Sequence, residues 1–248
     1  MRKLIRAEMY RLLHSGSYAR CMLLVALVMA VVPLLMDFSL LDKSLAENME
    51  TFLLSDNMLI LYVPYVSVFF VTAGYMKKTA YYEVMAGNKI GHMIGSKLLV
   101  DGIGIGFVSY VLAIALSAVV VVKNGTGGVT GLPLRAFLFL VICLHTTVLS
   151  VLIGMSVKHF AACAILFVRI QILDMIPVIM LPLLGEKINM SKATSERIMR
   201  CTLSQQISDV FRADISTELV VITVLSFVIE AMLWYGLVYF TMKKRWYK

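Results

Sequence analysis

Charged side chains are scarce in this chain of 248 amino acids, of which only 15% are Asp, Glu, Lys or Arg. An ordinary soluble domain is about a quarter charged and about half apolar, whereas 60% of this sequence is hydrophobic. A soluble fold of this size could not bury so much apolar surface. Apolar blocks run from Cys21 to Met242 without a polar stretch long enough for a second core. We therefore expect one membrane domain over residues 1–248.

Motifs for catalysis and metal binding are also missing. The sequence has no HExxH and no GxSxG, and its four cysteines have neither CxxC nor Cys/His ligand spacing. His145 is the only histidine deep in an apolar block, where a lone histidine more often makes a packing hydrogen bond than binds a metal. We predict no catalytic residue, no metal site and no cofactor bound by this chain, hence a function that is not enzymatic.

Six apolar blocks approach the roughly 20 residues that a helix needs to cross a bilayer. They are Cys21–Leu41, Met58–Tyr75, Leu98–Val122, Ala136–Val157, Phe160–Leu184 and Leu219–Met242. The predicted fold is an all-α polytopic membrane protein with six transmembrane helices.

Basic residues indicate the orientation, because loops rich in Lys and Arg stay in the cytoplasm. With the N-terminus inside, the inner segments carry 14 basic residues: Arg2, Lys3, Arg6, Arg11, Arg20, Lys77, Lys78, Lys89, Lys97, Lys158, Lys243, Lys244, Arg245 and Lys248. The outer segments carry 8: Lys43, Lys123, Arg135, Lys187, Lys192, Arg197, Arg200 and Arg212. We predict a protein of the cytoplasmic membrane with both termini inside. The net charge of +8 then meets lipid headgroups, and no nucleic-acid partner is expected.

Two inner segments are candidates for function. Residues 1–20 contain an amphipathic stretch, with Ile5, Met9, Leu12 and Leu13 on its apolar face, which predicts an interfacial elbow helix; a simple basic flank is an equal alternative. Residues 76–97 form the longest inner loop, long enough for a short helix against a cytoplasmic partner, although a solvated basic loop competes with that interpretation.

The same inner loop contains a spacing that resembles a phosphate-binding loop. Its G-x-x-x-G-S-K run from Gly91 to Lys97 is one residue short of the required G-x-x-x-x-G-K-[ST], and no soluble strand precedes it. We expect no ATP binding by this chain alone.

The outer segment 185–218 has apolar residues at helical spacing from Met199 to Phe211, with Arg200, Ser204 and Ser208 opposite them. This predicts an amphipathic helix at the outer surface. Packing on the spans is favoured over a role as a gate or a substrate contact.

Three charges lie inside apolar blocks: Arg169, Asp174 and Glu230. Such charges are costly in a bilayer and face protein or water, so an Arg169–Glu230 bridge between neighbouring spans is a reasonable hypothesis. A purely structural pair is at least as probable as a role in translocation. Gly102 and Gly106 form a GxxxG step that permits close helix contact.

The N-terminal MRKLIRAEMYRLLHS, the six predicted spans and the loop YYEVMAGNKIGHMIGSKLL resemble the permease subunits of type-2 ATP-binding-cassette exporters. The resemblance is to the small bacterial permeases of lantibiotic-immunity and antimicrobial-peptide resistance systems. The family's loop pattern falls on Glu83, Gly87, Lys89 and Lys97, with His92 where the family often has Arg.

The resemblance implies a coupling helix at Glu83 to His92 that docks in a separate ATPase subunit, which binds the ATP. It also implies a second permease chain, in a homodimer or a heterodimer, and an amphipathic peptide or lipid-like substrate that is expelled from the membrane. Two other functions remain open: a membrane scaffold that does not transport, and an ion-coupled carrier that uses Arg169, Asp174 and Glu230. An intramembrane enzyme is the least favoured class.

Overall fold

The computed structural model describes residues 1–14, 43–47, 85–156, 161–162, 164–165, 168–169, 176–177, 179–181, 191–212 and 215–246. In this part of the chain the regular elements are helices and no strand is present. They are α1 (Arg2–His14), α6 (Ile90–Lys97), the π-helix η2 (Leu98–Ile103), α7 (Gly104–Asn124), α8 (Leu132–Ser156), α11 (Lys192–Met199), α12 (Leu203–Arg212) and α13 (Thr217–Trp246).

Three helical segments are long and apolar enough to cross a membrane: Ile90–Asn124, Leu132–Ser156 and Thr217–Lys244. They coincide with the predicted third, fourth and sixth spans. The predicted spans 21–41 and 58–75 lie outside the described residues, as does most of 160–184. The chain is thus a helical protein with at least three helices of membrane-spanning length.

The segment predicted as the third span begins earlier than expected, at Ile90. Its first helix, α6, adds 8 residues before Leu98 and continues through η2 into α7. The extension is stable because Ile90, Met93 and Ile94 recur at helical spacing and are buried against other helices. Residues 90–97, predicted to belong to the inner loop, are therefore part of the helical bundle.

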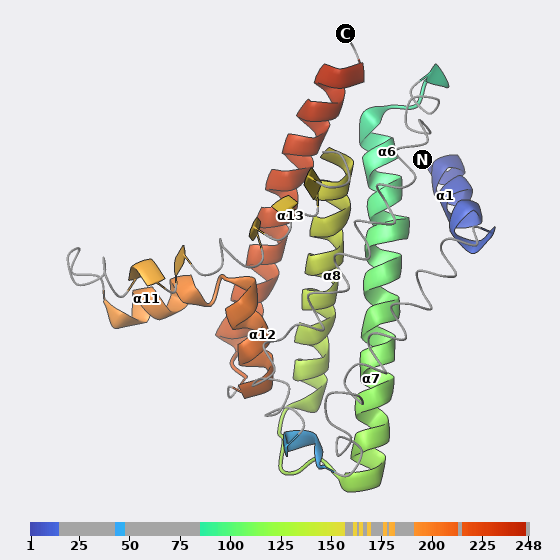
Figure 1. Ribbon diagram of the computed structural model, residues 1–248. Coiled ribbons are helices and arrows are strands. Elements are labelled where there is room, and N and C mark those ends of the chain that lie inside the picture. The colour runs from blue at the N-terminus through green and yellow to red at the C-terminus, as the bar shows by residue number, and fades with distance from the viewer. Residues whose placement is uncertain are drawn as a thin grey trace.

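Helix α8 is the centre of this bundle, between α7 and α13 (Figure 1). A Cβ atom at Gly102 would lie 3.3 Å from a methyl group of Val148, and one at Gly106 would lie 2.6 Å from the hydroxyl oxygen of Thr147. The Thr147 hydroxyl also donates a 2.8 Å hydrogen bond to the carbonyl of Gly102. The GxxxG step is confirmed as a close contact between two apolar helices.

Helix α1, the start of α6 and the C-terminal end of α13 lie toward one end of the bundle (Figure 1). At the opposite end, residues 43–47 lie against the loop that joins α7 to α8. There Asn124 donates a 2.8 Å hydrogen bond to the carbonyl of Lys43, and the Leu45 amide donates one of 3.2 Å to the carbonyl of Gly125. Among the described residues, α1 and the start of α6 therefore lie apart from residues 43–47 and the loop between α7 and α8.

A single amphipathic helix was expected from Met199 to Phe211. The structure instead has two helices there, because α11 ends at Met199 and α12 begins at Leu203. The chain turns at residues 200–202, where the hydroxyl of Thr202 accepts the Gln205 amide at 3.4 Å and caps α12. The apolar face is confirmed, because Leu203, Ile207 and Val210 are buried in one cluster with residues of α8. The expected packing of this segment on an apolar helix is therefore present, and the alternative role as a gate or a substrate contact stays a separate hypothesis.

Candidate functional site

Of the four predicted coupling residues, Gly87 and Lys89 lie on an exposed turn that leads into α6, and His92 lies in the first turn of that helix. Gly87 has a φ of +79°, a conformation that favours glycine, and Lys89 is extended. The carbonyl of Lys89 accepts the amides of His92 at 2.9 Å and Met93 at 3.1 Å, which starts the helix. The side chains of Lys89 and His92 are exposed, whereas Glu83 lies outside the described residues. This turn is accessible to a partner.

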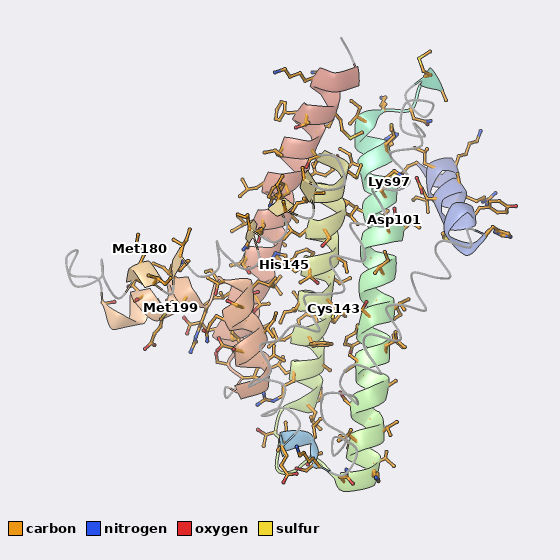
Figure 2. All side chains as sticks on the ribbon, viewed as in Figure 1. Lys97, Asp101, Cys143, His145, Met180 and Met199 are labelled. Atoms are coloured by element: carbon orange, nitrogen blue, oxygen red, sulfur yellow. The ribbon has the colours of Figure 1, made fainter. Side chains whose placement is uncertain are left out.

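A buried ion pair lies behind the turn, where α1 meets α6. The ammonium of Lys97 donates to the Glu8 carboxylate at 2.6 Å, and the two side chains are only 2% and 6% exposed. Asp101, one turn further along in η2, is fully buried. Figure 2 shows Lys97 and Asp101 together on the side of this helix near α1. The ion pair fixes the N-terminal helix to the beginning of the helical segment Ile90–Asn124.

This ion pair does not follow from the sequence pattern. Glu8 does not belong to the predicted apolar face of the N-terminal helix, and Lys97 is one of the basic residues of the predicted inner segments. The apolar face also differs from the prediction: Met9 is 50% exposed, whereas Glu8 is buried at 5% exposure. Burial of Lys97 is tolerated because its charge is neutralised by a partner that only the tertiary fold supplies.

A second cluster lies inside the bundle at Glu230 of α13. Arg169 binds its carboxylate through two nitrogens, with one contact of 2.5 Å from a terminal guanidinium nitrogen. Nε2 of His145 lies 3.0 Å from the same carboxylate. The pairing of Arg169 with Glu230 is therefore present as hypothesised. Asp174, the third predicted intramembrane charge, lies outside the described residues.

His145 extends this pair to a third helix. It lies inside the bundle, about midway along α8 (Figure 2), and is 2% exposed. Because the carboxylate only accepts hydrogen bonds, Nε2 carries the proton. The ring packs 5.2 Å from that of Phe227. This is the packing hydrogen bond expected of a membrane histidine; its partner, Glu230, could not be identified from spacing alone.

The chemistry of this triad is that of charge neutralisation. Arg169 and Glu230 carry opposite charges. The forked guanidinium group of Arg169 has a geometry suited to a carboxylate, and His145 supplies a further hydrogen-bond donor to Glu230. The three residues connect α8, α13 and the predicted fifth span. In the described part of the chain, no three His, Cys, Asp or Glu side chains lie close enough to hold a metal ion.

Comparisons of the chain with protein-family models, with curated proteins and with solved structures gave no match. Functional inference therefore rests on the residues themselves and on their geometry.

Proposed function

We propose that this chain is the membrane-spanning subunit of an ATP-driven exporter. In this proposal it spans the cytoplasmic membrane six times with both termini inside. A separate ATPase subunit hydrolyses ATP, and a second permease chain completes the pathway. The substrate class is an amphipathic peptide or a lipid-like molecule.

The observation that carries the proposal is the exposed turn at residues 85–89. It lies at the start of a helix that packs into the bundle, toward the end where α1 and the end of α13 also lie (Figure 1). Met85, at 69% exposure, and Lys89 are both accessible. A partner that binds this turn would be connected to the spans by α6, which is what a motor subunit requires.

A pull-down of the detergent-solubilised chain tests the proposal. The native protein is expected to recover an ATP-hydrolysing subunit, and the Glu83→Ala/Lys89→Ala variant is expected to lose it. A matched control, Lys123→Ala/Glu196→Ala, also removes one basic and one acidic side chain, but from predicted outer segments. This variant should retain the ATPase. Failure of the native protein to recover an ATPase, under conditions that preserve membrane complexes, would refute the proposal.

The Arg169–Glu230–His145 triad favours one alternative, an ion-coupled carrier, because ionisable groups within spans often line ion pathways. The two functions separate in vesicles. Transport by the exporter stops when ATP is removed and survives collapse of the proton gradient, whereas the carrier shows the opposite dependence.

A further inference from the structure

Helix α6 lies between α1 and α13, and its two glycines face different neighbours. A Cβ atom at Gly91 would lie 3.3 Å from the hydroxyl oxygen of Tyr235 on α13. A Cβ atom at Gly95 would lie 3.4 Å from the terminal methyl of Met1, at the start of α1. Gly91 therefore lies at a tight contact with α13, whereas at Gly95 the contact with Met1 is an ordinary van der Waals one.

The contact between α6 and α13 continues beyond Gly91. Ile90, Met93 and Ile94 belong to one hydrophobic cluster with Val238 and Met242 of α13. All five of these side chains are at most 4% exposed. Such close packing transmits displacement, because interiors of this density have little free volume.

On the other side, α1 holds α6 in place. Moving α6 away from α13 toward α1 would compress the Gly95–Met1 contact. Moving it away from α1 would separate the buried Glu8–Lys97 pair, which is unfavourable because the two charges attract each other strongly in a buried site. Helix α6 is thus held from two sides.

The π-helix η2 separates α6 from α7. Its wider hydrogen-bonding pattern interrupts the regular α-helical ladder between Lys97 and Gly104. The change of helix type therefore marks the junction between α6 and α7.

We propose that α6 transmits displacement of the 85–89 turn to α13 through the Gly91–Tyr235 contact, and that the Glu8–Lys97 pair keeps α6 seated in this contact. The inference rests on the proposed function, because the ATPase subunit supplies the displacement. Gly91 and Tyr235 are positioning residues: they touch neither substrate nor nucleotide. Helix α13 also carries Glu230, so its movement acts on the contacts with Arg169 and His145.

The test uses the full chain with its ATPase subunit in lipid nanodiscs. In a background without native cysteines, Met232→Cys places a thiol at an exposed position of α13, where Met232 is 69% exposed. Its rate of alkylation is compared without nucleotide and after trapping with ATP and vanadate. We expect trapping to change this rate in the otherwise native chain.

Gly91→Leu inserts a side chain between α6 and Tyr235 and should abolish the nucleotide-dependent change, while the ATPase still copurifies and hydrolyses ATP. Gly91→Leu/Tyr235→Ala makes room for the new side chain and should restore the change. Gly104→Leu is the matched control, because a Cβ atom at Gly104 meets nothing within 4 Å. If Gly91→Leu does not fold, Gly91→Ala with and without Tyr235→Phe provides the same comparison.

The outcomes distinguish the two proposals. If no ATPase copurifies with the native chain, the proposed function fails and the inference fails with it. If the ATPase copurifies and is active, two results overturn the inference alone. One is an alkylation rate at position 232 that is insensitive to trapping in the native chain, and the other is an unchanged response in the Gly91 variants.

Discussion

The Glu8 carboxylate and the Lys97 ammonium lie 2.6 Å apart in a buried contact that joins residues 89 positions apart in the sequence. The contact connects the N-terminal helix to the helical segment Ile90–Asn124. It is the most deeply buried ion pair in the described part of the chain, and it makes α1 part of the folded bundle.

Removal of one partner should be more damaging than removal of both. Lys97→Met leaves the Glu8 charge buried without its partner, which costs about 3–5 kcal/mol. Glu8→Gln/Lys97→Met removes both charges and should recover most of that loss. Thermal unfolding in detergent measures the effect, with Lys89→Met as the control because Lys89 is exposed. Equal destabilisation by Lys97→Met and Lys89→Met would contradict the buried pair.

The close contact between α7 and α8 should not tolerate a methyl group at Gly106. Gly106→Ala would place a Cβ atom 2.6 Å from the Thr147 hydroxyl oxygen and 3.2 Å from the carbonyl oxygen of Cys143. Overpacking of this kind costs about 1–3 kcal/mol. Gly104→Ala in the same helix meets open space and should be neutral or slightly stabilising. Comparison of the two thermal midpoints decides the point, and equal midpoints would argue against the contact.

At the intramembrane triad, Glu230 should be the most sensitive position because both other members bind it. Glu230→Ala leaves the Arg169 charge without this carboxylate and should destabilise the protein by about 3 kcal/mol or more. His145→Ala removes one hydrogen bond and some packing, for a smaller loss of about 1–3 kcal/mol.

The exchange Arg169→Glu/Glu230→Arg should restore part of the stability lost in either single variant. Thermal unfolding and the yield of monodisperse protein measure this. A double variant no better than the worse of the two single variants would show that the two residues do not act as a pair.

The thiol of Cys201, in the turn between α11 and α12, should react slowly and from one side of the membrane. Burial raises the pKa of this thiol, so less of the reactive thiolate is present at neutral pH. In a variant that retains only this cysteine, its alkylation rate should continue to rise with pH after that of a control thiol at position 193 has levelled off. Ala193→Cys is the control because residue 193 is exposed on the neighbouring helix.

The proposed topology places Cys201 outside the cell. A membrane-impermeant maleimide should therefore label it in intact cells. Labelling that appears only after permeabilisation would reverse the proposed orientation of the chain.

Local sequence patterns predicted the features that depend on neighbouring residues along one helix. The spans around α7, α8 and α13 follow from long apolar blocks, because a bilayer requires each helix to satisfy its own backbone hydrogen bonds. The close approach at Gly102 and Gly106 follows from the spacing of small residues. The Arg169–Glu230 pair was also inferred, since an isolated charge within a span is costly.

The remaining features depend on contacts between distant segments. Residues 90–97 look like a polar loop because they contain His92, Ser96 and Lys97. They are helical because α1, α8 and α13 bury their apolar residues. In the same way, the side chain of Gln206, just after the turn at residues 200–202, donates to Ser226 of α13 at 2.6 Å. Helical periodicity does not reveal this contact.

The sequence by itself determined that this protein is helical and belongs in a membrane, because hydrophobic content and block length depend only on composition and order. Only the tertiary structure decided that Lys97 is buried with Glu8, that Gly91 meets Tyr235, and that His145 binds Glu230. Each of these contacts joins residues far apart in the chain. Their free energy depends on burial and distance, which exist only once the helices have packed together.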